Sequence, residues 1–183
     1  STLMRSSAAS DVYKRQKHDL AVTGIWGMIE DELPLISKEI PVAFDFANKF
    51  ANPIVEKAIP YVTYAFFSFD EESRNEFRQK YHSMGLKEKE NCTEQLKEFM
   101  KAMQQKGPKV IIATLGKNGS IGYDGNSWYR FGIIECKVVD TMGAGDSFIA
   151  GFLYGILNGL NVQDSMEAGA QNSAVTIGYQ GAW

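Results

Sequence analysis

The sequence predicts an α/β protein with a doubly wound, mainly parallel sheet that carries helices on both faces. Three observations favour this class. Short apolar runs of strand length alternate with longer segments of helical periodicity. That order requires right-handed crossovers between parallel strands. The 183 residues, 44% hydrophobic and 22% charged, match one ordinary globular domain with a sizeable core.

The first two-thirds of the chain contain four expected strands and four expected helices. In the first helix, Leu33, Ile36 and Ile40 share one face. The fourth helix has the clearest start, because Asn91 and Glu94 form a capping-box pattern. The expected strands are 19–22, 41–46, 61–67 and 109–114, and the expected helices are 32–40, 53–59, 71–82 and 91–106.

The last third departs from this alternation. Asp124-Gly125 separates two short runs, 121–123 and 128–130, as the turn of a hairpin at the margin of the sheet does. A strand is expected at 136–139, an apolar helix at 147–158, and a final helix at 165–179 whose small residues permit close packing. We expect these aromatic residues to lie in the core: Trp26, Phe66, Phe67 and Trp128.

Charge and cysteine content exclude several classes of function. With 19 Lys and Arg against 22 Asp and Glu, the net charge of −3 offers no basic field for nucleic acid or an anionic membrane. No apolar run approaches the roughly 20 residues of a membrane span. Cys92 and Cys136 lack metal-ligand spacing, which favours free thiols in a reducing compartment. We therefore expect a soluble, cytoplasmic protein.

The amino terminus differs in pattern from the rest of the chain. Residues 1–16 lack the apolar stretch of a secretory signal and share none of the alternation of strands and helices. We interpret them as a non-native or disordered leader, and residues 17–183 as the domain.

The most informative segment is Asp-Thr-Met-Gly-Ala-Gly-Asp, from Asp140 to Asp146, which opens a helix. Its small residues Gly143, Ala144 and Gly145 let backbone N–H groups turn toward an anion, and the first turn of a helix leaves such groups unpaired. Asp146 at the edge of this cradle could take a proton from a hydroxyl nucleophile. The alternative is a simple turn in which Asp146 caps the following amides.

This segment resembles the second signature of the ribokinase-like carbohydrate kinases, the PfkB family. The resemblance implies that Asp146 is the catalytic base and that the amides of Gly143, Ala144 and Gly145 form the anion hole. It extends over residues 19–183. The run Tyr-Ala-Phe-Phe-Ser at 64–68 is most similar to the fructoselysine-type sugar-amine kinases.

The resemblance also implies an ATP site. Ligands of open α/β sheets gather beyond the carboxyl ends of the strands. There the chain has the loop 114–119, which resembles a family loop at the ATP site, although a Gly-x-x-Gly loop is also a common ordinary turn. The resemblance implies that Asn172, on the helix with many small residues, lies against the adenine. The predicted cofactor-binding residues are Thr114, Gly116, Lys117, Gly119, Thr141 and Asn172.

Two further loops are ambiguous. Glu71 matches a family position that orders Mg²⁺ through water, but Ser68 replaces the usual Asn, and the pair could equally form a capping box. Asp45 lies in a segment similar to an Asp-x-Asn region near the sugar, displaced by one residue. For Asp45 we expect a surface ion pair with Lys49 rather than direct catalysis.

The function implied is ATP- and Mg²⁺-dependent phosphoryl transfer to a hydroxyl of a sugar or sugar derivative. The alternatives are a nucleoside kinase of the same superfamily and a non-catalytic nucleotide-binding module. Family elements at both ends of the fold are missing, so we expect an incomplete domain with inefficient turnover. The resemblance leaves a homodimer of the full-length protein open, because dimers of this family form through lid strands. The residues that would identify the acceptor are largely absent.

Overall fold

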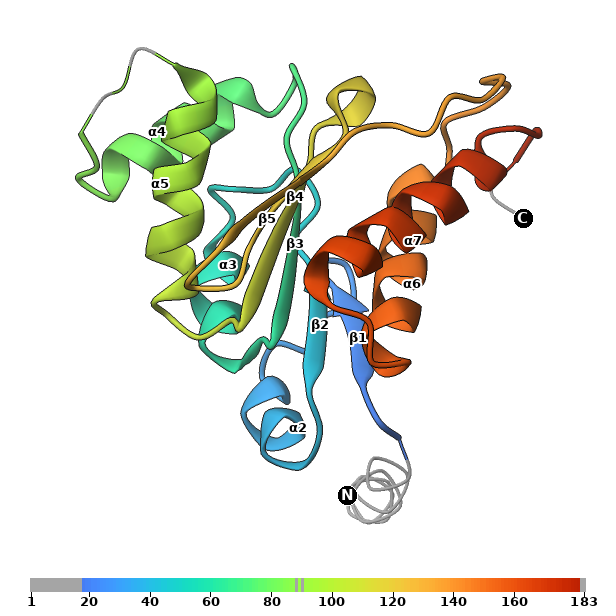
Figure 1. Cartoon of the computed structure of the whole chain (residues 1–183). Coiled ribbons are helices and arrows are strands. Elements are labelled where there is room, and N and C mark those ends of the chain that lie inside the picture. Colours follow the sequence, from blue (N-terminus) through green and yellow to red (C-terminus); the bar gives the residue numbers. More distant parts are fainter. Residues whose placement is uncertain (1–17, 88, 90, 182–183) are drawn as a thin grey trace.

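The computed structural model describes residues 18–87, 89 and 91–181. The predicted leader, 1–16, lies outside these residues. The described part is an α/β layered fold in which a six-stranded sheet separates two groups of helices, as Figure 1 shows. The predicted fold class is confirmed. Among the described helices, none combines the length and the apolar character needed to cross a membrane.

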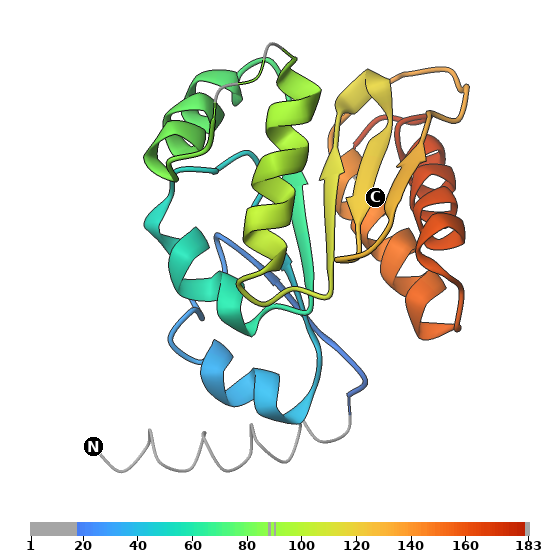
Figure 2. The same cartoon turned by 60° about the vertical axis from the view of Figure 1, so that its left-hand side comes forward.

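The sheet has the strand order β1-β2-β3-β4-β5-β6. Strands β1 to β4 pair in parallel, while β4-β5 and β5-β6 pair antiparallel. The predicted hairpin is therefore confirmed at the margin, and it is seen beside β4 in Figure 2. The strands are β1 Ala21–Gly24, β2 Val42–Asp45, β3 Tyr64–Ser68, β4 Val110–Thr114, β5 Ser120–Tyr123 and β6 Trp128–Phe131.

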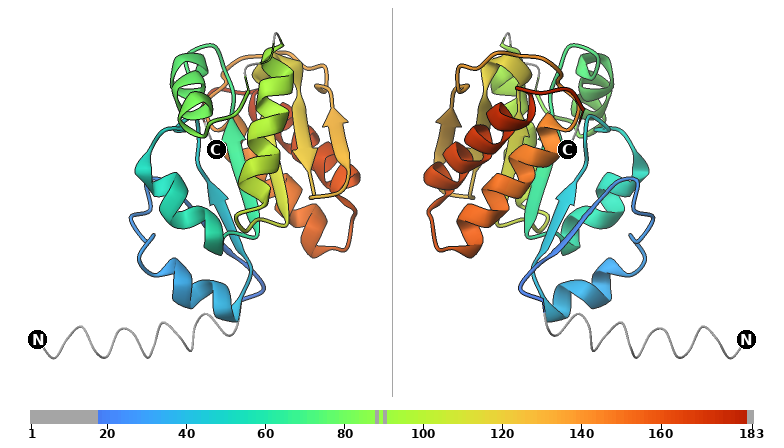
Figure 3. Two further views of the ribbon diagram at one scale, coloured as in Figure 1. Left: turned by 90° about the vertical axis from the view of Figure 1, so that its left-hand side faces the viewer. Right: turned by 90° about the vertical axis from the view of Figure 1, so that its right-hand side faces the viewer.

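One face of the sheet is covered by the helices from the first two-thirds of the chain (Figure 3, left). The Asn91 side chain accepts a hydrogen bond from the Thr93 N–H at 2.8 Å and so begins α5 where predicted. The Glu94 carboxylate pairs with Lys97 at 2.9 Å instead of completing a capping box. These helices are α2 Leu33–Glu39, α3 Pro53–Ala58, α4 Arg74–Ser83 and α5 Cys92–Gln104. Two short 3₁₀ turns lie elsewhere in the chain, at Ile59–Tyr61 and Gly116–Asn118.

The opposite face is covered by α6 (Ala144–Leu157) and α7 (Val162–Thr176), as the right-hand view of Figure 3 shows. The predicted close packing of small residues is confirmed. A Cβ added to Gly169 would lie 2.8 Å from the Phe148 carbonyl oxygen, so the two helices can approach this closely only because Gly169 has no side chain. Both helices bury apolar residues against Ile112 of the sheet.

Two expectations for apolar segments are wrong. Residues 136–139 form no strand: Val138 and Val139 are 60% and 50% exposed, and the Val139 N–H donates to the Ile177 carbonyl at 2.8 Å. The segment runs past the end of α7 and has no strand beside it, so its β-branched residues cannot form a ladder. Trp26 is 75% exposed, whereas Phe66 and Phe67 are buried as expected.

Candidate functional site

The four parallel strands bring their carboxyl ends to one edge of the sheet. Gly24 and Asp45 are paired at the ends of β1 and β2, and Ser68 and Thr114 are paired at the ends of β3 and β4. The first turn of α6 lies at the same edge, since Asp146 shares a cavity with Gly24 and Asp45. This is where ligands of open α/β sheets bind.

Two cavities meet this edge. The hairpin cavity, of about 710 Å³, lies between the loops that follow β3, β4 and β6 and the helices α6 and α7. The edge cavity, of about 650 Å³, lies between the ends of β1 and β2 and one side of α6. Gly145 lines the first and Asp146 the second, so consecutive residues of α6 face different cavities.

The predicted motif begins with a loop that Asp140 fixes at two points. Its Oδ1 accepts a hydrogen bond from the Met142 N–H at 3.0 Å, and its Oδ2 accepts one from the Gly181 N–H at 3.1 Å. These bonds, the first most strongly, hold the pKa of Asp140 below its usual value. The loop ends at Gly143, whose φ of 75° suits glycine, and α6 begins at Ala144.

The first turn of α6 presents unpaired backbone donors. The Ala144 N–H donates to the Thr141 carbonyl at 3.2 Å, but within the described residues the N–H groups of Gly143, Gly145 and Asp146 have no acceptor. A Cβ added to Gly145 would meet nothing within 4 Å, so this position opens into space. Gly143 occupies the N-cap position, and Asp146 lies exposed in the first turn. The alternative in which Asp146 is itself the cap is therefore not observed.

Most of the predicted cofactor-binding residues line the hairpin cavity. Gly119 is required there for two reasons: its φ is 83°, and an added Cβ would collide with the Phe131 carbonyl oxygen of the hairpin. The predicted residues that line this cavity are Thr114, Gly116, Lys117, Gly119, Thr141, Ala144 and Gly145. Their chain segments, far apart in sequence, meet in this one place.

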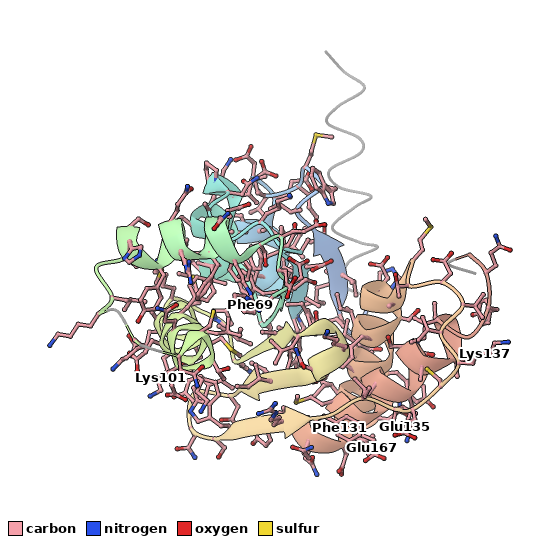
Figure 4. The ribbon with its side chains drawn as sticks, turned by 90° about the horizontal axis from the view of Figure 1, so that it is seen from above. Phe69, Lys101, Phe131, Glu135, Lys137 and Glu167 are labelled. Atoms are coloured by element: carbon pink, nitrogen blue, oxygen red, sulfur yellow. The ribbon has the colours of Figure 1, made fainter. Side chains whose placement is uncertain are left out.

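Apolar side chains that were not predicted from the sequence complete this cavity. Phe69 follows β3 and lies toward the middle of the molecule in Figure 4. The charged residue Glu135 also lines the cavity and lies on the side of α6 and α7 in the same view. Ile133 and Ile134 come from the segment between the hairpin and residues 136–139. No role was predicted for that segment. Phe148 and Ile177 complete the apolar wall. The apolar residues that follow the hairpin in the sequence were the signal from which this wall could have been predicted.

Three predicted site residues do not line either cavity. Gly143 ends the loop at the N-cap of α6, and Glu71 is exposed in the turn before α4. The Asn172 amide donates instead to the Ser147 carbonyl at 2.7 Å. Beside it, the Ser173 hydroxyl donates to the Ala144 carbonyl at 3.0 Å. Residues of α7 thus hold the first turn of α6 in place.

The turn around Glu71 is built by other residues. The Ser73 N–H donates to Asp70 Oδ1 at 2.7 Å, and the Asp70 N–H donates to the Ser73 hydroxyl at 3.0 Å. Ser68 accepts a hydrogen bond from the Thr114 hydroxyl at 3.3 Å, so the alternative in which Ser68 and Glu71 form a capping box is not observed. Asp70 lines the hairpin cavity. In the described part of the chain, no three His, Cys, Asp or Glu side chains gather as a metal site.

Besides Asp146, the edge cavity is lined by two carboxylate residues, Asp45 and the exposed Asp19. Asp45 lies half-buried at the end of β2, and its Oδ1 accepts a hydrogen bond from the Ala47 N–H at 2.8 Å. Burial raises the pKa of Asp45, and the nearby charge of Asp146 raises it further, although the Ala47 bond opposes both. The expected ion pair with Lys49 does not form.

Comparisons with known proteins agree with this arrangement. Residues 37–183 match the model of the pfkB family carbohydrate kinases. A fructoselysine 6-kinase of Shigella flexneri is 36% identical over 168 residues, which are 91% of this chain and 57% of that protein. A fructosamine kinase of Bacillus subtilis is 33% identical over 166 residues, or 91% of this chain and 52% of that protein. The chain thus spans little more than half the length of these relatives.

Solved structures show the same fold. The Arabidopsis thaliana ribokinase, determined with ribose and ATP, superposes with a TM-score of 0.77. The match covers 94% of this chain and 54% of the ribokinase at 20% sequence identity. The ribokinase-like architecture expected from the motif is therefore confirmed as a fold.

Proposed function

The chain belongs to the pfkB family of carbohydrate kinases, and from this premise we propose that it takes part in ATP-dependent phosphoryl transfer to a hydroxyl of a sugar or sugar derivative. One observation carries the proposal. N–H groups at the start of α6 that have no acceptor among the described residues lie between two cavities, and Asp146 lines the second of them. A donor nucleotide and an acceptor alcohol therefore have separate places on either side of one helical turn.

The hairpin cavity suits the nucleotide. Its wall of Phe148, Ile134 and Ile177 offers apolar contact to a planar base. At Gly145 the same cavity meets N–H groups that have no acceptor among the described residues, and these groups and the positive end of the α6 dipole favour phosphate. Lys117, exposed at the rim, adds a cation. These features support ATP as the phosphoryl donor.

In the proposed reaction, a hydroxyl oxygen of the acceptor attacks the γ-phosphorus in line with the leaving ADP oxygen. The proton of that hydroxyl passes to Asp146, and the P–O bond to ADP breaks. The N–H groups of Gly145 and Asp146 stabilise the charge on the transferring oxygens. No covalent intermediate with the protein is needed.

Magnesium is proposed to enter with the nucleotide. Mg²⁺ keeps several waters and binds through phosphate oxygens and one or two carboxylates. Asp70 lines the hairpin cavity and could supply an oxygen. The role of Glu71 through water stays a prediction. The ion would neutralise phosphate charge, and the acceptor proton would still pass to Asp146.

The test is an ATP-dependent phosphorylation assay with a panel of sugars, amino sugars and nucleosides. Because the chain spans about half of its relatives, we expect slow turnover, so phosphorylated product is measured by mass spectrometry over hours. Asp146→Asn should lower the rate by about 10²-fold to 10⁴-fold while ATP binding persists. Asp164→Asn, the same change in the first turn of α7, should leave the rate unchanged.

The outcomes separate the alternatives. ATP binding with no product from any acceptor would contradict the proposal and indicate a nucleotide-binding module. Product from nucleosides alone would contradict the sugar acceptor. An Asp146→Asn variant as fast as the parent chain would remove Asp146 as the base.

A further inference from the structure

The edge cavity offers more than the proposed base. Asp45 lies beside Gly24 across the β1-β2 pair, and an added Cβ on Gly24 would lie 3.0 Å from the Asp45 carbonyl oxygen and 3.4 Å from its Cβ. Glycine at this position leaves the space around Asp45 open. Asp45 and Asp146 therefore line the same cavity from two different elements, the end of β2 and the first turn of α6.

Within the described part of the chain, one of the two carboxylate oxygens of Asp45 has a hydrogen-bond partner. Oδ1 is held by the Ala47 N–H, in a tight turn where Ala47 itself adopts a φ of 48°. A left-handed conformation is uncommon for alanine and costs about 1 kcal/mol or more, so this turn lowers the stability of the fold by that amount. Across residues 18–87, 89 and 91–181, Oδ2 receives no hydrogen bond. The carboxylate is therefore held in one orientation, and its Oδ2 is available to a ligand that donates a hydrogen bond.

No salt bridge among the described residues includes Asp45, and the one His that lines its cavity, His18, is exposed. Among the described lining residues there is no Lys or Arg. Trp26, a residue that is 75% exposed, lines the same cavity and offers an aromatic ring, whose face attracts cations. An ionised carboxylate can only accept hydrogen bonds. A ligand beside Asp45 must therefore supply the donor.

We propose that Asp45 is a specificity-determining residue, whose Oδ2 binds a second donor group on the acceptor whose reacting hydroxyl faces Asp146. This inference rests on the proposed function. The second donor is best an ammonium group, then a hydroxyl, while a phosphate or carboxylate at that place is rejected. Removing a hydrogen bond to a charged group changes affinity by about tenfold to a hundredfold.

The ranking is tested with three ligands that differ in charge at one carbon: fructose, 1-amino-1-deoxyfructose and fructose 1-phosphate. Their affinities for the chain are measured by NMR titration in the presence of a non-hydrolysable ATP analogue. We expect the amine to bind most tightly and the phosphate most weakly. In Asp45→Asn, the amine should lose about tenfold or more in affinity and the phosphate should gain.

The control is Asp19→Asn, which removes the same charge from an exposed residue of the same cavity. Solvent screens that residue, so the ranking should change much less. Asn at position 45 can still accept the Ala47 N–H, and unchanged binding of the ATP analogue shows that the variant is folded.

Three outcomes would overturn the inference: no binding of any of the three ligands, an unchanged ranking in Asp45→Asn, or equal effects of both substitutions. These are distinct from failure of the proposed function. ATP binding with no phosphorylated product from any acceptor removes the function itself. If turnover depends on Asp146 but the order of the three ligand affinities is the same in Asp45→Asn, only this inference is contradicted.

Discussion

Asp146 and Gly145 are neighbours in sequence, yet they line different cavities. A helical turn rotates successive residues by about 100°, so one turn can present amides to one ligand and a carboxylate to another. The seven-residue motif was sufficient to predict this turn. For Asp45 the sequence predicted an ion pair with Lys49, which the structure does not contain. Its burial and its closeness to Asp146 were not predictable, because they depend on the β1-β2 pairing and on α6, which comes from a distant part of the chain.

The raised pKa of Asp45 predicts an effect on stability. A carboxyl group whose pKa is higher in the folded state than its ordinary value of 3.8 stabilises the fold when protonated, and this contribution is lost as the pH rises through the folded pKa. At pH 7 the ionised Asp45 therefore costs stability. Asp45→Asn should raise the melting temperature at pH 7 by a few degrees, as seen by calorimetry.

The pH dependence provides the check. The difference between Asp45→Asn and the parent chain should shrink as the pH falls below 3.8, where both side chains are neutral. A variant that is less stable at pH 7, or a difference that grows in acid, would show that the carboxylate is stabilising. A group that costs stability but is kept for binding is typical of functional sites.

At the scale of elements, α7 is the support for α6. The Ser147 and Thr176 hydroxyls share a hydrogen bond of 2.6 Å, and Asn172 and Ser173 bond carbonyls of the first turn of α6. The resemblance placed Asn172 at the adenine, whereas its amide bonds Ser147. Sequence patterns predicted both helices because their periodicity is local. They failed at 136–139, where strand formation depends on a neighbouring strand that the fold does not supply.

Gly169→Ala tests this support. The added methyl group would lie 2.8 Å from the Phe148 carbonyl oxygen, a backbone atom that cannot rotate away. The helices must separate, which we expect to lower the free energy of unfolding by about 1–3 kcal/mol in urea titrations and to weaken ATP binding. Gln171→Ala, at an exposed position of α7, should change stability by less than about 0.5 kcal/mol. Equal stability of the two variants would mean that the α6–α7 contact is loose.

At the scale of the whole molecule, the sheet determines which loops meet. Parallel pairing of β1 to β4 gathers four carboxyl ends at one edge, and the hairpin closes one cavity while the ends of β1 and β2 open the other. The alternation of strands and helices was enough to predict this edge. The lining of the cavities was only partly predictable, because the apolar wall comes from irregular segments whose course no periodicity describes.

Binding of nucleotide phosphate by the free N–H groups at the start of α6 is the step on which the proposed function depends. It can be observed by following backbone amide resonances of the ¹⁵N-labelled chain during titration with an ATP analogue and, separately, with adenosine. We expect the analogue to shift the amides of Gly145 and Asp146 strongly, whereas adenosine should shift residues of the hairpin cavity but leave these two amides in place. Equal shifts with both ligands, or amides of Gly145 and Asp146 that respond to neither, would show that phosphate does not bind there.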